Sequence, residues 1–62
     1  MTPAALKAEL DHHNLTPVEF ARLVGVQFST VYKWLRGESR VPLMAERLLA
    51  AWRVTGAPTP PE

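Results

Sequence analysis

The chain has 62 residues, of which 47% are hydrophobic, with no cysteine and a formal net charge of +1. This length allows one small domain, and the lack of cysteine excludes a disulfide framework and a thiolate metal site. No apolar run approaches the ~20 residues that cross a bilayer, and the start MTPAALKAEL lacks the basic and apolar regions of a signal peptide. We therefore expect a cytoplasmic protein with no membrane partner.

Basic side chains are concentrated in the second half of the chain. Residues 1–26 carry two basic and three acidic side chains, whereas residues 27–53 carry five basic and two acidic ones. Such a cluster can face phosphates. A solvated charged face would have the same composition, so the charge alone does not decide between the two interpretations.

The first predicted helix covers about residues 3–13. Thr2 and Pro3 can cap and start it, and Asn14 is a plausible left-handed exit. Leu6 and Leu10 lie one turn apart and predict a narrow buried stripe.

The sequence Asp11-His12-His13 at the end of this helix invites a metal-site interpretation. Adjacent helical residues point about 100° apart, so the two imidazoles do not converge on one ion, and no third ligand follows at a suitable spacing. We therefore expect no metal and no other cofactor.

The second predicted helix covers about residues 17–24. Thr16 at the N-cap, Pro17 at the first position and Glu19 at the third form a capping box with a preset first turn. Phe20 then begins an apolar face, and Gly25 supplies the positive φ that ends the helix in a sharp turn.

The third predicted helix covers about residues 28–36. Val31, Trp34 and Leu35 share one side, which we expect to face the core. Val31 follows the turn glycine by six residues, and Trp34 follows Val31 by three. This spacing predicts a helix-turn-helix, in which the second helix can project into a DNA groove.

The fourth predicted helix covers about residues 42–54 and carries an apolar stripe broader than a three-helix core needs. We expect Ala45 and Leu48 to face inward, which leaves Leu49, Trp52 or Leu43 exposed, and we assign Leu49 and Trp52 to a homodimer interface. The alternative is a monomer whose Trp52 folds back on the first helix. Residues 56–62 read as a flexible proline-rich tail beyond a domain of residues 1–55.

The stretch LTPVEFARLVGVQFSTVYKWLRG, residues 15–37, resembles the helix-turn-helix of the Cro/C1-type (XRE-type) regulators of bacteria and phages. The matching motifs are Leu-Thr-Pro, Phe-Ala, Leu-Val-Gly-Val, Ser-Thr-Val and Trp-Leu-Arg-Gly, and the likeness covers roughly residues 15–53. It implies an all-α fold, a small bundle of four to five helices of the lambda-repressor-like DNA-binding type. It also implies that residues 28–36 lie in the major groove of double-stranded DNA.

The resemblance assigns site residues by their place in the motif. Those expected to read bases are Gln27, Phe28, Ser29 and Lys33. Those expected to meet the DNA backbone are Thr16, Val18, Thr30, Tyr32, Arg36 and Arg40. Phe28 departs from the usual polar reader, and it could either pack on a thymine methyl or be buried against the second helix. Pro17 stands where the family often has a phosphate-binding glutamine.

The resemblance therefore implies a sequence-specific transcriptional regulator, a repressor that binds a palindromic operator as a homodimer and stays with the nucleoid. We expect no small-molecule ligand. An adaptor or antitoxin that uses the same fold to bind a protein is the alternative. We do not expect an enzyme, because the chain has no convergent carboxylate pair and no glycine-rich phosphate loop.

Overall fold

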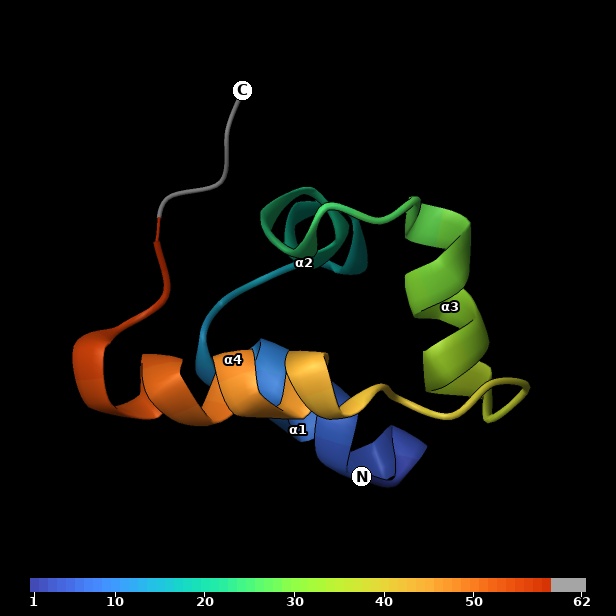
Figure 1. The fold of residues 1–62 in the computed structure, drawn as a ribbon, viewed down its shortest axis with the longest axis horizontal. Coiled ribbons are helices and arrows are strands. Elements are labelled where there is room, and N and C mark those ends of the chain that lie inside the picture. The colour runs from blue at the N-terminus through green and yellow to red at the C-terminus, as the bar shows by residue number, and fades with distance from the viewer. Residues whose placement is uncertain (59–62) are drawn as a thin grey trace.

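The computed structural model describes residues 1–58 and contains only helices in that part of the chain. The four helices are α1 (Pro3–His12), α2 (Pro17–Val24), α3 (Phe28–Arg36) and α4 (Leu43–Thr55). In Figure 1, α4 lies along α1 and α3 stands across their end, with α2 packed beside α3. The predicted all-α class is confirmed. Among the described residues, no helix has the length and apolarity that a bilayer crossing requires.

The helix ends follow the local signals in the sequence. Thr2 Oγ1 accepts a hydrogen bond from the N–H of Ala5 at 3.1 Å and caps α1. Thr16 Oγ1 accepts from the N–H of Glu19 at 3.1 Å, while Glu19 Oε1 accepts from the N–H of Thr16 at 2.9 Å, which is the predicted capping box. Three bounds shift by one residue: α1 ends at His12, and α4 begins at Leu43 after the N-cap Pro42 and ends at Thr55.

Left-handed residues end three of the helices or lead away from them. Asn14 has φ 56°, as expected for the exit from α1. Gly25 has φ 87° after α2 and Gly37 has φ 77° after α3, a region that residues with a Cβ rarely adopt. The sharp turn that sets α3 against α2 therefore depends on Gly25.

Phe20 lies at the centre of the core. Its ring meets Trp34 edge to face at 6.4 Å and Trp52 at 6.0 Å between centroids. The buried apolar residues come from all four helices and the loops between them: Leu6, Leu10, Leu15, Phe20, Ala21, Val31, Trp34, Val41, Ala45, Leu49 and Trp52. Three helices thus meet on one aromatic cluster, with Trp34 holding α3 to the rest.

The predicted orientation of α4 is confirmed for Ala45, which is 0% exposed, but is wrong for Leu49 and Trp52, which were expected to face outward. Leu49 is 1% exposed and Trp52 is 8% exposed, so both belong to the core of a single chain, while Leu48 is only half-buried. At 3.6 residues per turn, Ala45, Leu49 and Trp52 share one face. Trp52 also stands edge-on to His13 at 6.2 Å, which matches the alternative in which it folds back toward the first helix.

Ion pairs join α1 to α4 at both ends. Arg53 Nε lies 2.9 Å from each carboxylate oxygen of Glu9, and the amino group of Met1 lies 3.1 Å from Glu46. The hydrogen bond from Arg53 is the main cause that lowers the pKa of Glu9 from its ordinary value of 4.5. One ion pair joins the N-terminal ends of α1 and α4, and the other joins their C-terminal ends. The two helices therefore run in the same direction.

The predicted tail begins where α4 ends. Gly56 is the C-cap, and Ala57 packs partly against the core. Residues 59–62, which carry most of the tail prediction, lie outside the described residues.

Candidate nucleic-acid interface

The outer face of α3 is formed by the residues that the core does not use. Val31 is 0% exposed and Trp34 is 5% exposed, so the inner side of the helix is fixed. The four predicted base readers are all exposed on the other side or at the helix start: Gln27, Phe28, Ser29 and Lys33. The structure thus brings these four together on one surface.

Phe28 and Tyr32 form an exposed aromatic pair one turn apart on α3. Phe28 is 56% exposed and Tyr32 is 38% exposed. Their rings meet edge to face with centroids 6.1 Å apart and an interplanar angle of 89°. The alternative in which Phe28 is buried against the second helix is therefore wrong. The exposed apolar surface of these rings is available for contact with another molecule.

The start of α2 offers few donors to a phosphate. Pro17 has no N–H, and the N–H of Glu19 already donates to Thr16 Oγ1 at 3.1 Å. In the first turn, the N–H of Val18 is therefore the amide that the capping box does not use. Val18 itself is 39% exposed. The carboxylate of Glu19 stands at the same place, held by the backbone N–H of Thr16, which lowers its pKa. This end of the helix is a weaker anion site than its dipole alone implies.

Cations gather instead at the end of α3 and in the loop after it. Lys33, Arg36 and Arg40 are all exposed, whereas the predicted backbone contact Thr30 is half-buried. Arg36 forms an ion pair with Glu38, and both side chains keep more than half of their surface exposed. Sequence reasoning missed this pair, although two residues of opposite sign on either side of a turn glycine were a usable signal.

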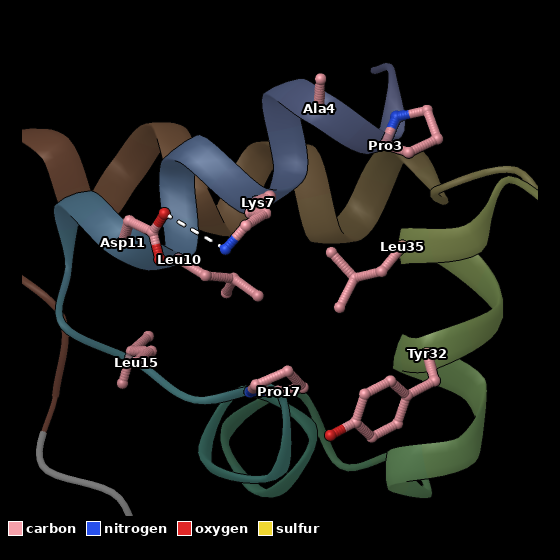
Figure 2. Close-up of a pocket in the computed structure, with 9 residues that line it drawn as sticks. All are labelled: Pro3, Ala4, Lys7, Leu10, Asp11, Leu15, Pro17, Tyr32 and Leu35. Carbon is pink, nitrogen blue, oxygen red and sulfur yellow. Dashed lines mark ion pairs between the residues drawn. The ribbon is translucent and has the colours of Figure 1, made fainter.

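A pocket of about 380 Å³ lies next to this surface, between α1, the start of α2 and α3. Its walls are mainly apolar, and Lys7 and Asp11 form an ion pair of 3.5 Å at its edge (Figure 2). The residues that line it are Pro3, Ala4, Lys7, Leu10, Asp11, Leu15, Pro17, Tyr32 and Leu35. In Figure 2 the hydroxyl of Tyr32 points toward the start of α2. Tyr32 is thus shared between the pocket and the outer face of α3.

A family model described as helix-turn-helix matches residues 6–50. The match covers α2, the turn, α3 and most of α1 and α4, which together are well over half of the chain. No curated protein and no solved structure matches the chain. With the turn glycine, the capping box and the projecting α3 in place, the chain belongs to the Cro/C1-type helix-turn-helix family of DNA-binding transcriptional regulators.

Proposed function

We propose that this domain is a repressor that binds a specific operator sequence with α3 in the major groove. One observation carries the proposal: α3 is held to the core by Val31 and Trp34, while its opposite side presents exposed polar, basic and aromatic side chains. A recognition helix needs this arrangement, because it must be rigid and still reach base edges. The proposed location is the cytoplasm, with the nucleoid.

Base readers and backbone contacts take different parts of this surface. Gln27 can bond an adenine edge, Ser29 can donate or accept, and Lys33 can reach guanine O6 and N7. Backbone contacts come from the hydroxyl proton of Thr16, which the cap leaves unused, the amide of Val18, and side chains further along: Thr30, Tyr32, Arg36 and Arg40. Phosphate contacts of this kind orient the domain without specifying sequence.

The proposed homodimer uses the outward face of α4 rather than Leu49 and Trp52. Leu43 is 58% exposed, Met44 is 52% exposed and Val54 is 88% exposed. The alanines at 50 and 51 are also exposed, and their small side chains allow a second α4 to approach closely. A two-fold dimer would read a palindrome whose half-sites lie about one helical turn apart.

Selection of bound duplexes from a random library tests sequence-specific recognition. We expect a palindromic consensus and an affinity that falls linearly with the logarithm of salt concentration. Lys33→Ala and Ser29→Ala should change the selected sequence, whereas Arg40→Ala should weaken all sequences alike. Recovery of no consensus by a folded protein would refute the proposal.

A protein-binding adaptor or antitoxin is the second candidate. The exposed aromatic ring of Phe28 and the carboxylate at the start of α2 favour it, because neither attracts a phosphate backbone. If Lys33→Ala and Ser29→Ala leave DNA affinity unchanged and abolish a protein contact, this candidate replaces the first.

A further inference from the structure

We propose that Phe28 and Tyr32 make this domain a reader of C5-methyl groups in the major groove. Binding would then favour thymine or 5-methylcytosine at one defined position of each half-site. This inference rests on the proposed function, because it requires that α3 enters the groove. The inference adds to the proposed function the chemical group that Phe28 and Tyr32 recognise.

The position of the aromatic pair on α3 is the first argument for methyl recognition. Phe28 is the first residue of the helix, and the N-terminal residues of a recognition helix are those that meet base edges. Tyr32 follows one turn later on the same face, and its ring meets Phe28 edge to face at 6.1 Å. The partner ring limits the directions that the phenyl group can adopt. A constrained ring loses less entropy on binding than a free one.

The chemistry of the groove carries the second step. A phenyl ring has no donor or acceptor for a base edge. The major groove offers one apolar group, the C5-methyl of thymine, and cytosine displays the same group when it is methylated. Phe28 exposes 56% of its surface, so it has area left to bury against a methyl.

The direction of the Tyr32 hydroxyl carries the third step. It points toward the start of α2 (Figure 2), while the ring itself contacts Phe28 edge to face. The hydroxyl can still donate to a phosphate without leaving the pair. Loss of the hydroxyl alone should therefore weaken binding to all sequences and leave methyl recognition unchanged.

The size of the effect follows from the burial of one methyl group. Such a group contributes about 0.8 kcal/mol, which is about a fourfold change in affinity per methyl. A dimer that reads one methyl in each half-site should show about a sixteenfold change when both are lost.

The test uses the operator recovered by random selection, with each thymine replaced in turn by deoxyuridine. At the sensitive position, a second pair of duplexes carries cytosine or 5-methylcytosine in an otherwise identical sequence. The wild-type domain should lose about fourfold on the uracil substitution and gain about fourfold on cytosine methylation. The thymine and uracil duplexes measure recognition of the thymine methyl group. The cytosine and 5-methylcytosine duplexes measure recognition of the methyl group on methylated cytosine.

Variants separate methyl recognition from general weakening. Phe28→Ala should abolish the difference between thymine and uracil, and Tyr32→Ala should reduce it. Tyr32→Phe is the matched control, which should weaken binding to all duplexes alike and keep the difference. Phe28 lies outside the core, so its variant should keep the wild-type melting temperature.

Specific outcomes overturn the inference. Equal affinity for thymine and uracil duplexes at every position refutes methyl recognition while leaving the DNA-binding proposal intact. A difference that persists in Phe28→Ala assigns the methyl contact to another residue and refutes the inference as well. If the folded domain selects no DNA sequence, both the inference and the proposed function fail.

Discussion

Substitution of Glu38 by glutamine should tighten binding to DNA of any sequence. Arg36 is a proposed backbone contact, yet its guanidinium pairs with Glu38 in the free domain. The side chains are 59% and 55% exposed, so the pair lies in high dielectric. Exposed pairs of this kind contribute about 0.2–1 kcal/mol, and binding to a phosphate must first overcome that attraction. Glu38→Gln removes this cost, so the expected gain is about 1.4- to 5-fold.

Fluorescence anisotropy on the selected operator and on an unrelated duplex measures this gain. The factor should be the same on both, since phosphate contacts carry no sequence information. It should shrink as salt rises toward physiological strength, where the screening length is about 8 Å. Arg36→Ala is the control background, in which Glu38→Gln should lose most of its effect. Unchanged or weaker binding of Glu38→Gln at low salt would show that Arg36 does not meet the backbone.

Three further predictions concern the fold and the assembly. Thr16→Ala removes the side-chain acceptor that caps α2 and should lower the free energy of unfolding by about 1 kcal/mol, measured by urea titration. The lowered pKa of Glu9 stabilises the folded state above its ordinary value of 4.5, and this stability is lost as the pH falls through the folded-state value. The difference in melting temperature between wild type and Glu9→Gln should therefore shrink below that pH, whereas a constant difference would refute the role of Arg53. Val54→Glu, at an 88% exposed position, should give a monomer in sedimentation, while Ala8→Glu on exposed α1 should not.

Local signals in the sequence were sufficient to predict the helix ends to within one residue and to predict the outer face of α3. The capping box at Thr16 and the positive φ at Gly25 depend on neighbours within four residues, so the pattern contains them completely. The outer face could be predicted because Val31 and Trp34 lie in the core, so the remaining residues of α3 must lie on its other side. Phe28 needed the structure, since an aromatic residue at a helix start is compatible with both burial and exposure.

The orientation of α4 could not be predicted for a different reason. Leu48 and Leu49 are adjacent and chemically identical, so periodicity alone allows either to face inward. The choice depends on where Phe20 places its ring, and that position is set by α2 and α3 together. Because Trp52 meets Phe20 at 6.0 Å, the helix turns Leu49 inward and leaves Leu43 and Val54 outside. Periodicity within one helix therefore assigned two core residues, Leu49 and Trp52, to an exposed surface.

Stability and DNA affinity compete for the same groups at the start of α2. The reciprocal bonds of Thr16 and Glu19 use the amide that a phosphate would take, and Pro17 removes another. Both features stabilise the helix, and both weaken this end as an anion site. In the proposed complex, backbone affinity must then come from the cations after α3, where Glu38 already partners Arg36. Electrostatic attraction is thus modest, so discrimination between sequences depends more on what the outer face of α3 contacts in the groove.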